Sequence, residues 1–374
     1  MYRSAWCEVD LRQFHENLSV LRRNANTRAL LVVKANAYGH GLLRMALEAE
    51  RAKIDMLGVA TIGEAGELLA GGVHAPVLIM CALDHAEIDY CVANGIHFMA
   101  WSVDHFRQAA KSAAKYGKQP HIHLEIDTGM SRSGIVPSNL IELLDCLSAA
   151  DLKTIVGVMT HFHSADLEDN KSSESQLSAF RRCVERLAAR DIRPLVHAAN
   201  SPGTLRLPES RLDMVRLGIA AYGLPPSEYT TLPPGVRPVL SWHARVTNVK
   251  TVHAGTGVGY GWQHIAEGDQ RIATLAVGYA DGYRRSPRGC NTVIVQGVEA
   301  PVVGSVFMDQ CVFVIPTAAV CEVGCAVVLM GSQLSASLTA EKLAERWLTN
   351  NYDVVAGIRS RVPRCYVSGP SRTS

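Results

Sequence analysis

Reactive side chains in this sequence follow short apolar segments in the N-terminal part of the chain. Lys34 comes directly after Ala29–Val33, and a lysine partly removed from water is the residue type that forms Schiff bases with carbonyl compounds. Ser201 and the backbone amides of Gly218 and Ile219 follow two later segments, and a hydroxyl beside clustered N–H groups suits a phosphate. Cationic and imidazole side chains stand at similar places, at Arg132, His161 and Arg216.

The apolar segments that precede these residues are predicted β-strands, and amphipathic helical segments separate most of them. The predicted strands are Ala29–Val33, Met56–Ala60, Val77–Cys81, Ile96–Ala100, His121–Asp127, Thr154–Thr160, Leu195–Ala199 and Met214–Leu217. The helical segments include Ser102–Tyr116, Asn139–Ala149 and Ser173–Arg190. This alternation predicts an α/β fold with an N-terminal (β/α)8 TIM barrel, and a doubly wound open sheet is the main alternative.

In a TIM barrel the carboxyl ends of all strands meet on one face, which is where such enzymes carry their reactive groups. Taken alone, Lys34 could be a surface lysine, and Ser201 could be the N-cap of a helix that starts at Pro202. Polar groups at five strand ends favour a functional site over these simpler interpretations.

The chain changes character after residue 230. Pro225-Pro226 and Pro233-Pro234 mark a linker. Beyond it lie short apolar runs with Gly-rich turns, at Val239–Thr247, Arg271–Val277, Thr292–Val295, Cys311–Ile315 and Ala326–Met330. We therefore predict a cofactor-binding barrel domain over 1–230 and a mostly β domain over 236–374, with which Met1–Asp10 could pair. One helix is expected in it, over Ala340–Thr349, with Thr339 as its N-cap.

Composition narrows the class of protein. A chain of 374 residues is too long for one compact core, and a net charge of +2 gives no reason to expect nucleic-acid or membrane partners. No apolar run is long enough for a membrane helix, and the first residues lack the pattern of a signal peptide. The ten cysteines are scattered without a C-x-x-C pair, so we expect reduced thiols in a cytoplasmic protein.

Two histidine pairs have the alternating spacing of a possible metal site, His121 with His123 and His161 with His163. No third ligand with suitable spacing stands out near either pair. We interpret these histidines as structural or cofactor-packing residues and expect no metal.

Several ordered motifs resemble the alanine racemase family. The segment from Val33 to Gly41 (VKANAYGHG) is similar to the cofactor-lysine signature of that family. Later motifs follow in the family's order and span nearly the whole chain: Asp127-Thr128-Gly129-Met130 with Arg132, Thr160-His161-Phe162, Ala199-Asn200-Ser201, Arg216-Leu217-Gly218-Ile219, Gly259-Tyr260-Gly261, Val277-Gly278-Tyr279-Ala280-Asp281-Gly282, Phe307-Met308-Asp309-Gln310 and Arg361-Val362-Pro363-Arg364.

The resemblance implies a pyridoxal 5'-phosphate enzyme of fold type III. By this resemblance Lys34 holds the cofactor covalently and is one of two catalytic bases. Its phosphate is bound by Tyr38, Ser201, Gly218 and Ile219, while Arg216 faces the pyridine nitrogen and His161 packs behind the ring. Within the quoted motifs, Asn200, Tyr279 and Asp309 are expected to support the site.

The resemblance also implies a head-to-tail homodimer with shared active sites. Tyr260 of the partner subunit would be the second base, and Met308 of the partner subunit would bind the substrate carboxylate together with Arg132. Racemisation requires one proton acceptor on each face of the substrate Cα, so a lysine and a tyrosine fit conversion of L-alanine to D-alanine. D-alanine biosynthesis for the cell wall and breakdown of D-amino acids are both open as its purpose. An arginine at the pyridine nitrogen, which does not protonate it as an aspartate would, favours racemisation over transamination.

Three residues depart from the family pattern as we know it. Glu125 stands where many members carry a carbamylated lysine, and its carboxylate would offset and orient Arg132 without modification. Phe307 replaces a small residue. Ser360 stands where a tyrosine often closes the pocket, so we expect serine or a larger amino acid to be tolerated beside alanine.

Three alternative functions remain at this point. The enzyme could be a serine or broad-specificity racemase. It could be a barrel-type amino-acid decarboxylase. That class, however, has an acidic residue as the partner of the pyridine nitrogen, where this sequence has Arg216. A non-catalytic cofactor-binding protein is the third, and the segment from Val236 onward, with Tyr260, argues against it.

Overall fold

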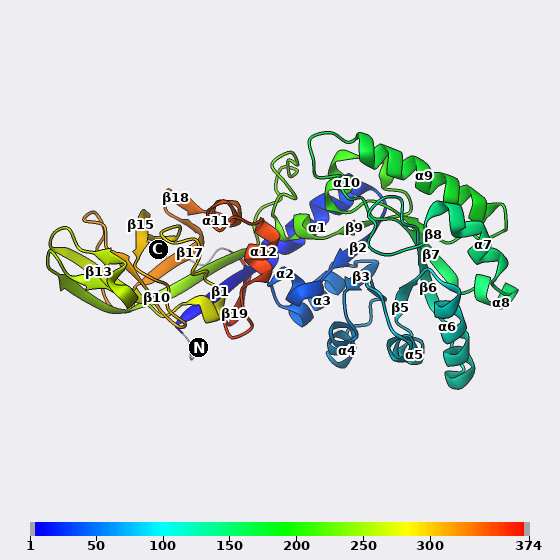
Figure 1. The fold of residues 1–374 in the computed structure, drawn as a ribbon, viewed down its shortest axis with the longest axis horizontal. Helices are drawn as coiled ribbons and strands as arrows, with labels where there is room; N and C mark the ends of the chain where they lie inside the picture. Colours follow the sequence, from blue (N-terminus) through cyan, green and yellow to red (C-terminus); the bar gives the residue numbers. More distant parts are fainter. Residues whose placement is uncertain (1–3, 370–374) are drawn as a thin grey trace. The chain divides into compact units, whose positions relative to one another are not determined.

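The computed structural model describes residues 4–369 and separates into two compact units (Figure 1). The barrel unit comprises 15–37 and 42–237. The described part of the β unit comprises 4–14, 38–41 and 238–369. Met1–Arg3, part of the opening segment considered above, lie outside the described residues.

The barrel unit contains eight parallel strands in the order β8-β7-β6-β5-β4-β3-β2-β9. Their bounds are β2 Arg28–Val32, β3 Met56–Val59, β4 Val77–Ile79, β5 His97–Ala100, β6 His121–Glu125, β7 Ile155–Met159, β8 Leu195–His197 and β9 Met214–Leu217. Backbone hydrogen bonds join the two ends of this order, from Asp213 N to the Val196 oxygen (3.1 Å) and from Arg216 N to the Ala199 oxygen (2.9 Å). The sheet is closed, so the predicted barrel is confirmed and the open-sheet alternative is wrong.

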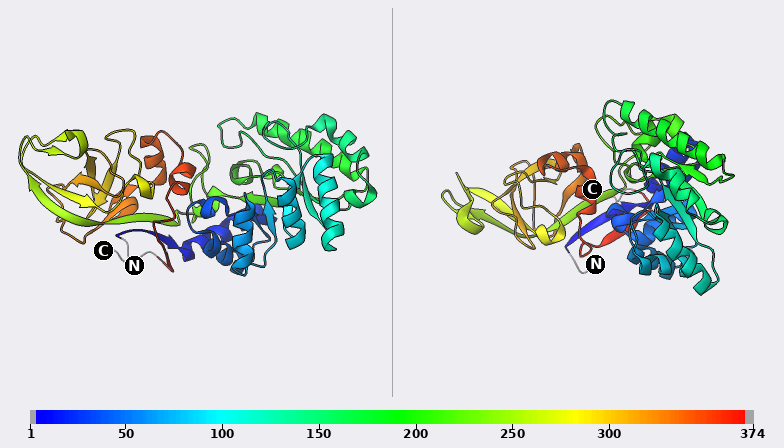
Figure 2. Two further views of the ribbon diagram at one scale, coloured as in Figure 1. Left: turned by 60° about the horizontal axis from the view of Figure 1, so that its bottom comes forward. Right: turned by 45° about the vertical axis from the view of Figure 1, so that its right-hand side comes forward.

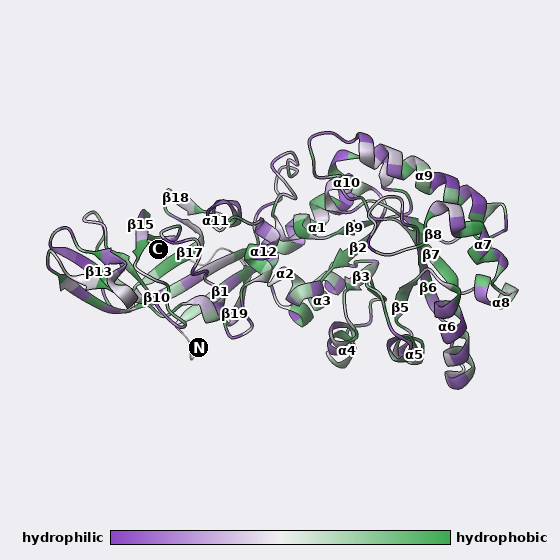
Figure 3. Cartoon of the chain, viewed as in Figure 1, coloured by the Kyte–Doolittle hydropathy of each residue, from purple (hydrophilic) through white to green (hydrophobic). Residues whose placement is uncertain are grey.

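Helices cover the outside of this barrel (Figure 1). They are α1 Leu11–Ala25, α3 Leu42–Arg51, α4 Ile62–Ala70, α5 His85–Asn94, α6 Val103–Tyr116, α7 Leu140–Asp145, α8 Ala149–Leu152, α9 Lys171–Ala188 and α10 Ser201–Arg206, with 3₁₀ turns η1 Pro137–Asn139, η2 Pro208–Ser210 and η3 Ile219–Tyr222. The strands are mostly green and the exposed faces of α6 and α9 mostly purple in Figure 3, as expected for amphipathic helices on a buried sheet.

Local capping explains where these helices begin. Ser102 accepts a hydrogen bond from His105 N and starts α6, so the predicted helix is confirmed there. The predicted helix Asn139–Ala149 is wrong in its C-terminal half, because α7 ends at Asp145. Ser148 then forms a capping box with Asp151 and starts α8.

The β unit is built around one nine-stranded sheet in the order β18-β17-β14-β15-β16-β13-β10-β1-β19. Its strands are β1 Ala5–Asp10, β10 Leu240–Val252, β13 Gln270–Leu275, β14 Thr292–Val295, β15 Val298–Val303, β16 Cys311–Val314, β17 Ala326–Gln333, β18 Ala336–Leu338 and β19 Arg364–Val367. The long strand β10 runs the length of this sheet (Figure 2). Strand β1 lies between β10 and β19, with Ala5 opposite Ala244 and Cys7 beside Arg364.

Smaller elements complete the β unit: the hairpin β11 Gly257–Val258 with β12 His264–Ile265, the turns η4 Tyr260–Trp262 and η5 Tyr279–Asp281, and the helices α11 Ala340–Arg346 and α12 Asn351–Ala356. Thr339 caps α11 as predicted, by accepting from Lys342 N at 3.3 Å. The helix ends at Arg346, three residues before the predicted Thr349.

Residues 38–41 group with the β unit although their neighbours on both sides belong to the barrel unit. Arg364 Nε donates to the Gly39 oxygen at 2.8 Å, and the Tyr366 hydroxyl donates to the His40 oxygen at 3.2 Å. A Cβ at Gly39 would lie 2.0 Å from the Val355 oxygen, so only glycine permits this approach.

The ten cysteines all lie within the described residues and none forms a disulfide there. Within residues 4–369, no helix combines the length and the apolar composition that crossing a bilayer requires.

Candidate functional site

Lys34 begins a short left-handed turn at the carboxyl end of β2. The four residues that follow, Ala35 to Tyr38, have φ between 52° and 56°. A left-handed conformation costs an L-residue about 1–2 kcal/mol, so four in a row require strong support. The turn redirects the chain immediately after Lys34, which keeps the lysine at the end of the strand.

Hydrogen bonds from three sides hold this turn. Ala37 N donates to the Val33 oxygen at 2.7 Å, and Leu42 N donates to Asn36 Oδ1 at 2.8 Å. Ala35 N donates to Glu64 Oε1 at 2.7 Å. The carboxylate of Glu64 also accepts from the backbone N–H groups of Ala60 and Thr61, at 2.8 and 3.2 Å.

Glu64 thus joins the loops after β2 and β3. Sequence reasoning did not select it, although the pair Thr61 and Glu64 has the spacing of a capping box, which the structure contains.

Arg216, on β9, is a buried cation at 3% exposure. Its Nη1 lies 3.1 Å from both the oxygen and Nδ1 of His197. Its Nη2 donates to the oxygens of Thr160 (2.8 Å) and Ala198 (2.9 Å) and lies 3.3 Å from His161 Nδ1. Burial lowers the pKa of Arg216 to about 10, partly offset by the Glu125 carboxylate, so the group stays charged at neutral pH.

His161 shows which of the predicted residues lie together. Burial, together with the positive charges of Arg216, Arg132 and Lys34, lowers the pKa of His161 to about 3. Three cations from three different strand ends therefore act on one neutral imidazole. Of the four residues predicted to converge at one rim, Arg216 and His161 are in direct contact, while Lys34 and Arg132 act on His161 through their charge.

Glu125 is the anion among these cations. Its side chain is 3% exposed, and Oε2 is a buried oxygen for which the described residues provide no hydrogen-bond partner. Burial raises the pKa of Glu125, while a hydrogen bond from Ser133 and the charges of Arg132 and Arg216 oppose that rise. The carboxylate influences Arg132 through its field, because the described residues contain no ion pair between the two.

The loop that carries Arg132 is ordered by side chains which sequence reasoning had not assigned a function. Asp127 Oδ1 accepts from the backbone N–H groups of Gly129 and Ser131, both at 3.0 Å. Gln176, on α9, donates to Thr128 Oγ1 (3.2 Å) and to the His161 oxygen (3.1 Å). It ties the loops after β6 and β7 together from a distant helix, for which the sequence held no signal.

Ser201, Gly218 and Ile219 form a compact group of donors. Gly218 N donates to Ser201 Oγ at 2.8 Å, so the amide and the hydroxyl are adjacent. Ile219 opens a 3₁₀ turn, where the first backbone N–H has no acceptor within the turn. Asn200 is the N-cap of α10, since its Oδ1 accepts from Gly203 N at 3.0 Å. The simpler interpretation of Ser201 as the N-cap is therefore wrong.

The predicted residues of the β unit form a second group. Tyr260 is 72% exposed on a turn whose Gly259 has φ +76°, and its ring packs edge-on against Phe307 with centroids 5.4 Å apart. Tyr279 N donates to the Phe307 oxygen and Ala280 N to the Met308 oxygen, both at 3.0 Å. These bonds bring the two segments so close that residue 278 must be glycine, because a Cβ there would lie 2.3 Å from the Phe307 oxygen.

Arg361 connects this group to the turn that contains Ser360. It forms ion pairs with Asp309 and, at 3.0 Å, with the fully buried Asp281. Ser360 itself is exposed. Tyr38 packs near Tyr352, with ring centroids 6.1 Å apart, and burial raises the pKa of Tyr38 to about 12, so its hydroxyl remains a donor.

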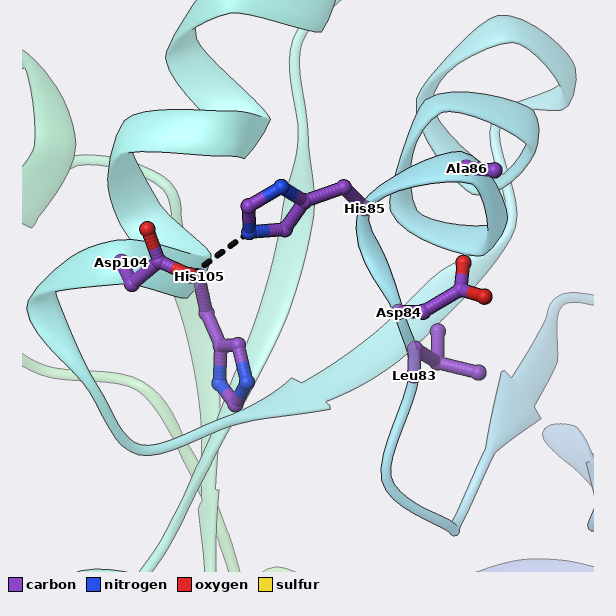
Figure 4. Close-up of a pocket in the computed structure, with 6 residues that line it drawn as sticks. All are labelled: Leu83, Asp84, His85, Ala86, Asp104 and His105. Carbon is purple, nitrogen blue, oxygen red and sulfur yellow. Dashed lines mark hydrogen bonds and ion pairs between the residues drawn. The ribbon is translucent and has the colours of Figure 1, made fainter.

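A separate pocket of about 520 Å³ lies at the first turns of α5 and α6 and is lined by none of the predicted site residues (Figure 4). His85 Nε2 and Asp104 Oδ2 are 2.6 Å apart there, with side chains 57% and 67% exposed. Across residues 4–369, no group of three histidine, cysteine, aspartate or glutamate side chains is arranged to hold a metal ion.

Comparison with known proteins gives the class of this fold. Models of the alanine racemase N-terminal domain and C-terminal domain match residues 9–226 and 239–366. A solved alanine racemase from the D-cycloserine-producing Streptomyces lavendulae has a TM-score of 0.93 and 33% identity over 99% of this chain and 98% of its own. Another, from Bacillus anthracis with bound L-Ala-P, has a TM-score of 0.91 and 32% identity, over 98% and 96%. The two units together define an amino-acid racemase, an isomerase with a barrel and a β domain.

Sequence relatives narrow this class. An alanine racemase of Symbiobacterium thermophilum is 37% identical over 366 residues, 97% of each chain. One of Methanococcus maripaludis is 35% identical over 367 residues, covering 97% of this chain and 98% of its own. The chain belongs to the alanine racemase family.

Glu64→Gln tests the support of the left-handed turn. Because the amide has one acceptor oxygen where the carboxylate has two, we expect the free energy of unfolding to fall by about 1 kcal/mol. Denaturant titration measures this, with Glu67→Gln as the control, since Glu67 is an exposed residue of the same helix. Equal stabilities of the two variants would contradict the assigned role.

Proposed function

We propose that this enzyme interconverts L-alanine and D-alanine with pyridoxal 5'-phosphate and two bases, Lys34 and the partner's Tyr260. The observation that carries the proposal is the buried, charged Arg216 near Lys34. Among the described residues, the hydrogen bonds of this guanidinium use Nη1 and Nη2. We propose that its Nε–H donates to the unprotonated pyridine nitrogen of the cofactor.

The residues fit the proposed cofactor at both ends. The donors at Ser201 and Gly218 suit its phosphate, with the phosphate oxygens taking the place of the Ser201 hydroxyl as acceptor for Gly218 N. Lys34 at the end of β2 would bind the aldehyde carbon. When bound, this cofactor withdraws electrons from the substrate Cα and makes its hydrogen acidic.

The two bases would act on opposite faces of Cα. One removes the proton while the other, already protonated, delivers a proton from the other side, and the two roles exchange in the reverse direction.

An exposed tyrosine on a glycine-flanked turn supports the role of Tyr260 in a homodimer. A tyrosine that served only packing would bury its ring, yet this one is 72% exposed, and Met308 nearby is 54% exposed. We propose that this surface enters the site of the other subunit, where the backbone of the partner's Met308 and Arg132 bind the substrate carboxylate.

Arg216 also separates racemisation from decarboxylation. A permanently charged arginine leaves the ring nitrogen unprotonated, which weakens electron withdrawal and shortens the lifetime of the deprotonated substrate. Quick reprotonation at Cα favours racemisation over slower side reactions.

Substitution of each base gives a distinct result. Lys34→Ala should abolish racemisation. Tyr260→Phe should reduce it by about 10²–10⁴-fold but still allow exchange of the Cα hydrogen of one enantiomer in deuterated water. Chiral chromatography with mass spectrometry measures both quantities, and Tyr90→Phe, an exposed tyrosine of α5, is the control. Exchange of both enantiomers in Tyr260→Phe would exclude the two-base mechanism.

Glu125→Gln should increase the free energy of unfolding and weaken substrate binding. Burial raises the pKa of Glu125, so the ionised carboxylate costs folding free energy at neutral pH. The variant should therefore be more stable than wild type at pH 8. That advantage should shrink as the pH falls below the raised pKa, and vanish below about 4.3, the usual value for an unfolded glutamate.

The same variant should have a higher KM for alanine, because Arg132 loses the nearby negative charge. Denaturant titration at several pH values and racemase kinetics provide the two measurements, with the exposed Glu142→Gln as control. A variant that matches wild type in KM would show that Glu125 has no part in substrate binding.

Ser360→Tyr tests the substrate range. We propose that the small, exposed Ser360 leaves space that a tyrosine would fill, so serine and larger amino acids are accepted beside alanine. One extra group in a pocket changes selectivity by about 1–3 kcal/mol, hence the serine-to-alanine ratio of kcat/KM should fall by about tenfold or more in the tyrosine variant. An unchanged ratio would refute the idea.

A further inference from the structure

Four histidines form a continuous chain of contacts through the barrel unit to Arg216. His121 Nδ1 lies 3.1 Å from His97 Nε2, and His97 Nδ1 lies 3.1 Å from His123 Nε2. His123 Nδ1 lies 2.8 Å from His197 Nε2, and His197 Nδ1 lies 3.1 Å from Arg216 Nη1. Each link joins the Nδ1 of one ring to the Nε2 of the next.

Strand register brings these rings together. His97 and His121 begin β5 and β6 and are direct neighbours across the two strands. His197 ends β8, so the chain runs from the amino ends of β5 and β6 to the carboxyl end of β8. His121 is half-buried, whereas His123 and His197 are 1% and 0% exposed.

A glycine makes space for the central ring. Gly157 on β7 is the register partner of His123 on β6. A Cβ at this position would lie 2.2 Å from His123 Nδ1, closer than any van der Waals contact. The adjacent rings are inclined by 61° and 74° to His123, which is geometry for N–H···N contacts between rings and not for stacking.

The arginine dictates where each ring carries its proton. A guanidinium only donates, so His197 Nδ1 must be an acceptor and its proton must be on Nε2. That Nε2–H then requires His123 Nδ1 as acceptor, and the same requirement passes to His97 and to His121. All four rings are therefore Nε2–H tautomers with one direction of donation, away from Arg216 and towards the half-buried His121.

Burial keeps the inner rings neutral, as this order requires. It lowers the pKa of His97 to about 4 and those of His123 and His197 well below the usual value of histidine. Neutral rings with the same tautomer are joined head to tail, and the unprotonated nitrogen of each ring lies on the side of the chain that leads to Arg216. The chain thus stabilises a positive charge that is buried beside mostly neutral groups.

We propose that His197, His123, His97 and His121 are positioning residues that fix the direction and the charge of Arg216 during racemisation. This inference rests on the proposed function, in which Arg216 faces the cofactor ring. The histidine chain is useful there because a reversed His197 would turn an N–H towards Nη1 and displace the guanidinium. The effect of a substitution should therefore decrease with distance from Arg216, from His197 to His121.

The proton order itself is measured on the cofactor-free protein. In ¹⁵N spectra of protein labelled in its histidine side chains, all four rings should have a protonated Nε2 and an unprotonated Nδ1. Substitution of the exposed His74 with Gln identifies the signal of a surface ring for comparison. A protonated Nδ1 on His123 or His197 in the wild-type protein would overturn the proposal. These spectra decide the proton order even if the racemase assay finds no activity.

Two substitutions at one position test the link to catalysis. Glutamine at His123 offers an oxygen to His197 Nε2–H and an N–H to His97, so His123→Gln should retain the proton order and most of the activity. His123→Leu leaves a buried N–H without an acceptor. We expect roughly a tenfold lower kcat from such a loss, a smaller change in KM, and a changed signal for the His197 Nε2–H group that has lost its acceptor.

Gly157→Ala interrupts the same chain without removing a histidine. It should lower kcat and alter the His197 signals, whereas Gly268→Ala, at a glycine with open space around it, should do neither. Equal activity of His123→Leu and His123→Gln would overturn the proposal, as would wild-type spectra and kcat in Gly157→Ala. If the leucine variant does not fold, the wild-type spectra and the Gly157→Ala comparison still decide.

Discussion

The burial of one guanidinium is the constraint around which the barrel interior is built. Arg216 is 3% exposed, and an unsatisfied buried charge would cost several kcal/mol. The protein compensates with backbone oxygens from the ends of β7 and β8, with His197, and with the field of Glu125. Each of these hydrogen bonds holds the end of a strand in place. The contacts that satisfy one buried side chain therefore also align the loops that carry the other site residues.

The barrel site contains more positive than negative side chains. Lys34, Arg132 and Arg216 face one buried carboxyl, Glu125, while His161 is kept neutral by burial and by the cations. Excess positive potential suits a ligand with a phosphate and a carboxylate.

Much of the fold followed from sequence because period and composition act locally. Each barrel strand is short, mostly apolar and followed by a loop, which left little ambiguity. The break between α7 and α8 was missed, because Ser148 competes as a helix cap inside a pattern that otherwise reads as one helix. The left-handed turn after Lys34 could not be predicted, since glycine is the usual sequence signal for such a turn and Ala35 to Tyr38 include none. Glu64, Gln176 and the partners of His123 depend on contacts between elements far apart in sequence, which one sequence cannot specify.

The grouping of residues 38–41 with the β unit also limits how this protein could be divided or inherited. The chain crosses between the two units four times, at 14/15, 37/38, 41/42 and 237/238. A single cut therefore never yields two whole units, and one recombination event cannot exchange either unit intact. Because the segment after Lys34 belongs to the β unit, the two units cannot be exchanged independently. We therefore expect them to change together in evolution.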